Sequence, residues 1–140
     1  MSRILLSTAL ALGIGAASAA ERLPPRQNDF TQFEFCYGNL EGSQTVLPLL
    51  KDQFDPAIFE QVSKATDDFV EAFLDVETRL GAAILHPDKA DLNTAHMRGY
   101  QLWMRPENQT LDYWSRNGPM PAVCFDLFKR LNEILPLNLN

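Results

Sequence analysis

The sequence has few residues of the kinds that most often bind metals or perform redox chemistry, with two cysteines and two histidines among 140 residues. His86 and His96 stand in neither an HExxH nor a zinc-finger spacing, and Cys36 and Cys124 do not form a CxxC pair. The GxSxG, P-loop, GxGxxG and CxxCH motifs are also missing. The sequence therefore offers no motif for a zinc enzyme, a thiol oxidoreductase, a nucleotide-binding protein or a serine hydrolase, and we expect no catalytic residue, metal or cofactor.

Positive charge is scarce as well. Twelve lysines and arginines face 18 aspartates and glutamates, which gives a net charge of −6 at pH 7. Nucleic acids and anionic membranes attract basic surfaces, so we expect this chain to bind neither nucleic acid nor, after cleavage of its signal peptide, a membrane. The expected partner is another protein, and a basic one.

Residues 1–19 are typical of a secretory signal peptide. Arg3 precedes an apolar run over 4–12, and small residues at 17–19 predict cleavage after Ala19, with Ala20 as the alternative. A transmembrane anchor is the other interpretation, but the run is short for a span of ~20 residues and is followed by glycines. We expect a periplasmic or secreted protein.

The remaining chain divides into a flexible leader, residues 20–28 with Pro24 and Pro25, and one helical domain, residues 29–140. About 120 residues are enough for a single hydrophobic core. No segment alternates apolar and polar residues for long enough to predict a strand, so little or no sheet is expected.

The longest predicted helix covers about 56–86. Asp55 and Pro56 supply an N-cap and a first helical residue, and Pro87 ends the pattern. An apolar seam runs along it at steps of three and four: Phe59, Val62, Thr66, Phe69, Phe73, Val76, Leu80 and Ala83. Such a helix is about 45 Å long, so we expect the other elements to lie along it.

Similar spacing predicts further helices over about 29–53, 88–105, 107–116 and 122–135. Pro48 makes the first of these either one bent helix or two short ones. The prediction is an all-α fold: a small bundle of about four or five helices around one long helix, with one disulfide.

The disulfide is predicted from the two cysteines, because an even count in an exported chain usually means a bridge. Pairing Cys36 with Cys124 requires Cα atoms within about 7 Å. Closing so long a loop is worth about 4 kcal/mol in the chain-entropy model. A catalytic thiol is the alternative, but neither cysteine has a histidine near it in the sequence.

The long predicted helix carries most of the negative charge. Residues 52–77 contain eight acidic side chains and one basic side chain, Lys64. Some of these acids stand four residues from Lys64 or Arg79 and are expected to pair on a solvated face. Asp67 and Glu71 do not fit that account, and they are the candidates for steering a basic partner.

Residues 98–116 concentrate side chains that are enriched at protein interfaces. The partner-binding candidates in this segment are Tyr100, Trp103, Arg105, Tyr113 and Trp114. Each tryptophan is equally well explained as a core residue.

Three functions therefore stay open. The first is an exported protein-binding protein, and the second is an accessory or scaffold subunit without catalytic activity, in which the long seam allows a homodimer. The third is a metal-dependent periplasmic enzyme using His86 or His96 with Asp88 or Asp91.

A family resemblance favours the first function. Residues 36–42, CYGNLEG, have the form CxGxxxG, and Pro87, Tyr100-Gln101-Leu102 and Pro106-Glu107 follow in order. This arrangement resembles the Tai-type (resistance-associated) immunity proteins that accompany amidase effectors of type VI secretion systems. The resemblance implies a small exported helical protein with disulfides that protects the periplasm by plugging a peptidoglycan amidase.

The chain departs from that family pattern in its cysteines. Leu85 and His86 stand where a cysteine is expected before Pro87, and Cys124 falls inside the last predicted helix instead of after it. The small residues of CxGxxxG also have a structural use, since they let helices approach closely. The resemblance implies inhibition by occlusion, with the acidic helix steering a basic effector and the aromatic segment anchoring it, and it transfers no individual contact residue.

Overall fold

The predicted all-α fold is confirmed by the computed structural model, which describes residues 25–83 and 88–135. No strand occurs within these ranges. The elements in chain order are α2 (Gln27–Val46), the 3₁₀ helix η1 (Leu47–Gln53), α3 (Pro56–Ala83), α4 (Lys89–Met104), the 3₁₀ turn η2 (Pro106–Asn108), α5 (Leu111–Asn117) and α6 (Ala122–Ile134). The predicted signal peptide, residues 1–19, lies outside the described residues.

The first helix begins earlier than its sequence pattern indicated. Residues 27 and 28, expected at the end of the leader, already belong to α2. The reason is that Asp29 sits in the first turn, where its Oδ2 accepts a hydrogen bond from the Arg26 backbone N–H at 3.0 Å. Arg130 of α6 binds the other carboxylate oxygen at 2.8 Å, which ties the last helix to this end of α2.

Pro48 turns the chain into η1 and thus ends α2 at Val46. The long helix α3 then starts where predicted, because Asp55 Oδ1 accepts hydrogen bonds from the backbone N–H groups of Ala57 and Ile58 at 3.0 and 3.3 Å. It is described as far as Ala83; the last predicted residues, 84–86, lie outside the described residues.

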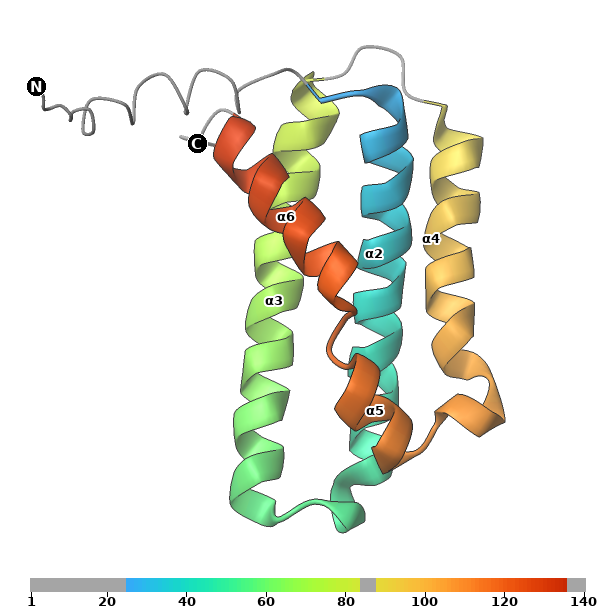
Figure 1. Cartoon of the computed structure of the whole chain (residues 1–140), viewed down its shortest axis with the longest axis vertical. Coiled ribbons are helices and arrows are strands. Elements are labelled where there is room, and N and C mark those ends of the chain that lie inside the picture. The colour runs from blue at the N-terminus through green and yellow to red at the C-terminus, as the bar shows by residue number, and fades with distance from the viewer. Residues whose placement is uncertain (1–24, 84–87, 136–140) are drawn as a thin grey trace, which may run out of the picture.

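The helix that contacts most of the others is α2, not the longer α3. In Figure 1, α2 runs between α3 and α4, and α6 crosses in front. Contacts join α2 to α3, α4, η1 and α6, whereas α3 packs against α2, η1 and α6. The expectation that other elements lie along α3 therefore holds for α2 and α6, while α4 packs on the opposite side of α2.

Glycines bring α2 and α4 into backbone contact. A Cβ added at Gly38 would lie 1.9 Å from the carbonyl oxygen of His96, and one at Gly99 would lie 2.0 Å from that of Phe35. A Cβ added at Gly42 would lie 2.8 Å from the Trp103 side chain. The CxGxxxG pattern of α2 thus serves helix packing, which is the structural use that the sequence allowed.

Two hydrophobic clusters fill the bundle. The larger one includes Phe33, Leu40, Phe73 and Leu131, together with the Cys36–Cys124 disulfide, whose Cα atoms are 5.5 Å apart. The predicted disulfide is therefore confirmed, and it joins α2 to α6. The smaller cluster lies at the other end of the bundle and consists of Val46, Leu47, Leu50, Trp103 and Trp114.

The glycine contact predicts unequal effects of adding one methyl group. Gly99→Ala should lower the free energy of unfolding by about 3 kcal/mol, because the helices must separate to admit a Cβ. Gly81→Ala is the matched control, since a Cβ there meets nothing within 4 Å and an alanine in a helix gains up to about 1 kcal/mol. Urea denaturation followed by circular dichroism measures both. Equal stabilities for the two variants would contradict the close contact.

Candidate functional site

The acidic side chains predicted to steer a partner lie on the outer face of α3. Asp67 and Glu71 are exposed and stand one turn apart. Leu74 follows at the spacing that places it on the same side of the helix, and it is 51% exposed. We call Asp67, Glu71 and Leu74 the acidic face.

Neighbouring acids are neutralised within α3, but those of the acidic face are not. Lys64 binds Asp68 at 3.0 Å and Arg79 binds Asp75 at 2.9 Å, which confirms two of the expected pairs four residues apart. Asp67 accepts a hydrogen bond from Gln44 of α2 at 2.8 Å. Among the described residues, no basic side chain lies within ion-pair distance of Asp67 or Glu71.

A groove of about 330 Å³ borders Asp67 on one side. It lies between α3 and the segment from the end of α2 through η1, and Phe59 and Thr66 contribute to its wall. Lys51 lies over the Phe59 ring, with its Nζ 5.9 Å from the ring centroid. This arrangement shows how a long basic side chain packs against the groove.

The two tryptophans predicted as partner contacts are core residues instead. Trp103 is 0% exposed and Trp114 is 5% exposed, so neither ring offers surface to a partner. The Trp114 indole N–H donates to the backbone carbonyl of Ser43 at 3.2 Å. The turn that begins at Pro106 folds α5 back against η1 and thereby directs the Trp114 ring inward. Trp103 is buried by the packing of α4 on α2, where its side chain lies against Gly42.

Of the other partner-binding candidates in residues 98–116, the two tyrosines are partly buried and Arg105 is exposed. Tyr113 packs edge-on against Trp103, with ring centroids 5.0 Å apart, and Tyr100 donates from its hydroxyl to Thr45 Oγ1 at 3.4 Å. Arg105 is exposed at the end of α4. Since α3 and α4 lie on opposite sides of α2, the structure does not bring Arg105 and the acidic face together (Figure 1).

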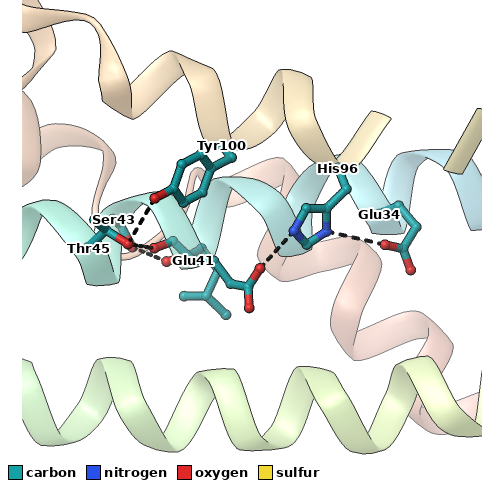
Figure 2. A network of polar contacts seen from close by, with 7 residues as sticks. Glu34, Glu41, Ser43, Thr45, His96 and Tyr100 are labelled. Atoms are coloured by element: carbon teal, nitrogen blue, oxygen red, sulfur yellow. Dashed lines mark hydrogen bonds and ion pairs between the residues drawn. The ribbon is translucent and has the colours of Figure 1, made fainter. Parts of the chain in front are cut away.

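A polar cluster around His96 was not predicted from the sequence. His96 of α4 lies between two glutamates of α2, with Nδ1 3.4 Å from Glu34 Oε1 and Nε2 2.7 Å from Glu41 Oε1 (Figure 2). The sequence offered Asp88 and Asp91 as partners, but Asp88 caps α4 through the backbone N–H groups of Ala90 and Asp91. The available signal was that Glu34 and Glu41 are seven residues apart, two turns of helix, with Gly38 between them.

Contacts within this cluster raise the pKa values of Glu77 and His96 and lower that of Glu34. Burial, hydrogen bonding with Glu34 and repulsion from that carboxylate raise the pKa of Glu77, on α3, to about 8. Hydrogen bonding with Glu34 also raises the pKa of His96, against the opposing effect of burial. Burial opposes ionisation of Glu34, but its hydrogen bonds with His96 and Glu77 outweigh this and lower its pKa.

Tyr37 completes the cluster from α2. Burial and the nearby carboxylates of Glu41, Glu77 and Glu34 raise its pKa to about 12. His96 is held by two carboxylates that favour its charged form, and the raised pKa of Glu77 keeps that side chain protonated at neutral pH. The contacts of His96 with Glu34 and Glu41 fasten α4 to α2. Among the described residues, no group of three or more histidines, cysteines, aspartates or glutamates is placed to hold a metal ion. His86, the other candidate ligand, lies outside the described residues.

Comparisons with protein-family models, with curated proteins and with solved structures find no match to this chain. Within the described part of the chain, no helix combines the length and the apolar character needed to cross a membrane.

The His96 cluster predicts that stability falls as the pH rises from about 5 to beyond 8. Glu77 holds its proton in the folded state up to about pH 8, far above its unfolded value of 4.5, so folding becomes less favourable across that interval. The contribution of charged His96 is complete below about 6.5 and is lost as the pH passes its raised folded pKa. The contribution of ionised Glu34 is fully present above about pH 4.5, its unfolded value, and is lost as the pH falls through its lowered folded pKa.

Glu77→Gln should flatten this decline, because the amide has no proton to lose. Chemical denaturation at a series of pH values measures the effect, and Glu133→Gln, on the exposed surface of α6, is the control that should keep the slope of the native protein. A native protein whose stability rises between pH 5 and 8 would contradict the shifted pKa values.

Proposed function

We propose that this chain is an exported protein that binds a basic protein partner through the acidic face of α3. The observation that carries the proposal is that Asp67 and Glu71 are exposed and form no ion pair among the described residues, while Leu74 is half exposed beside them. Carboxylates that are not paired with a cation attract positive charge, and an apolar side chain among them offers area to bury.

The two kinds of side chain have separate effects on binding. Unpaired carboxylates on a chain of net charge −6 accelerate the encounter with a cationic protein, an effect that salt weakens. Burial of Leu74 contributes after contact and slows dissociation.

In the finer form of the proposal, the partner is a cationic effector that acts on peptidoglycan, and this chain is an immunity or inhibitor protein that occludes it. The support is the resemblance to Tai-type immunity proteins, together with a disulfide, which suits an oxidising compartment. Gly38 and Gly42 of the resembling segment are buried against α4, so the resemblance bears on the helix pair and the contacts with the effector come from α3.

A photo-crosslinking amino acid in place of Leu74 identifies the partner in producing cells. Association of the purified partner with the mature chain is then followed by stopped flow at several salt concentrations. Asp67→Lys with Glu71→Lys should slow association about tenfold or more at low ionic strength, and the difference should shrink at high salt. The dissociation rate should change less.

The matched control is Asp126→Lys with Glu133→Lys, which makes the same change of charge on exposed positions of α6 and should slow association much less. Equal on-rates for the native chain and the α3 variant would refute the steering role. Inhibition is tested separately by producing the partner in the periplasm with and without this chain. A captured protein that is not inhibited would favour the accessory-subunit alternative.

A further inference from the structure

A second groove lies on another part of the bundle, above the disulfide. Its volume is about 400 Å³, within the range of small-molecule sites. Three helices line it, α2, α4 and α6, through Thr31, Gln32, Phe35, Cys36, Ala95, Arg98, Val123, Cys124 and Leu127. The disulfide fixes α6 to α2, so the floor of the groove is already formed without a ligand.

The chemistry of the lining is an apolar surface with a single charged group. Arg98 is the only charged residue in the wall, in a chain whose net charge is −6. No carboxylate of the described residues lies within 4.0 Å of its guanidinium. Val123, which also lines the groove, is 71% exposed, which leaves a branched apolar side chain in water.

We propose that this groove binds a small amphipathic carboxylate with an unbranched apolar tail, of the medium-chain fatty acid type. The tail lies along Phe35, Leu127 and Val123 and covers the exposed valine. The carboxylate accepts charge-assisted hydrogen bonds from the Arg98 guanidinium. Charge complementarity decides between ligands of this size, because Arg98 is exposed at the rim of the groove, where a carboxylate pairs with its guanidinium, an alcohol does not, and an amine is repelled by it. This site is independent of the acidic face of α3.

Sodium octanoate, kept below its micelle concentration, is the probe. Its addition to the ¹⁵N-labelled mature chain should produce saturable shifts of the amide resonances of Thr31, Phe35, Val123 and Leu127. Arg98→Gln should weaken binding about tenfold, the effect of removing a charged hydrogen-bond donor from a carboxylate. Arg105→Gln removes the same charge from the exposed end of α4 and should leave the affinity unchanged. Octanol should bind more weakly than octanoate.

Three results would overturn the proposal. The first is an absence of saturable shifts with octanoate in a chain whose spectrum shows it to be folded. The second is equal affinity for octanol and octanoate together with no effect of Arg98→Gln, which would leave the arginine without a role. The third is a shift of the same resonances on concentrating the protein without octanoate, which would assign the groove to a second copy of the chain.

Discussion

The distance between α2 and α4 is the constraint on which much of the remaining structure depends. At Gly38 and Gly99 each helix presents bare backbone to a carbonyl oxygen of the other, so the two axes approach more closely than any side chain permits. This approach places the His96 ring between Glu34 and Glu41. It also packs the Trp103 side chain against Gly42, where the indole is part of the smaller hydrophobic cluster. Larger residues at the glycines would weaken the ion pairs and the aromatic packing together.

Some features of the fold are encoded locally and were predictable from the sequence. The start of α3 follows from the Asp55 side chain and Pro56, and its buried stripe follows from residue spacing. The disulfide follows from the even cysteine count, which predicted a bridge between Cys36 and Cys124. The central position of α2 was not predictable, because a helix contacted from several sides has no single apolar stripe. Its buried residues include polar ones, Glu34, Asn39 and Ser43, beside the hydrophobic ones.

The candidate sites were predictable to different extents, because some depend on a single helix and others on how separate helices pack. Exposure of Asp67 and Glu71 follows from their position on α3 opposite its apolar stripe. Burial of Trp114 depends on how the chain turns after Pro106, and burial of Trp103 depends on how α4 packs on α2. The sequence does not decide these points, because tryptophan is common both in cores and at interfaces. The His96 cluster and the groove above the disulfide combine residues of separate helices. They appear only when the register between those helices is known.

The position of the disulfide also determines what a protease can remove from this protein. The bridge joins α2 to α6 across 88 residues, so α3, α4 and α5 lie within one covalent ring. One peptide-bond cleavage anywhere inside that ring opens it without releasing a fragment, and the cut ends stay attached to a packed core. Only the segments before Cys36 and after Cys124 can be trimmed away by single cuts. In a compartment that contains secreted proteases, such a chain is able to keep both its acidic face and its groove after being nicked.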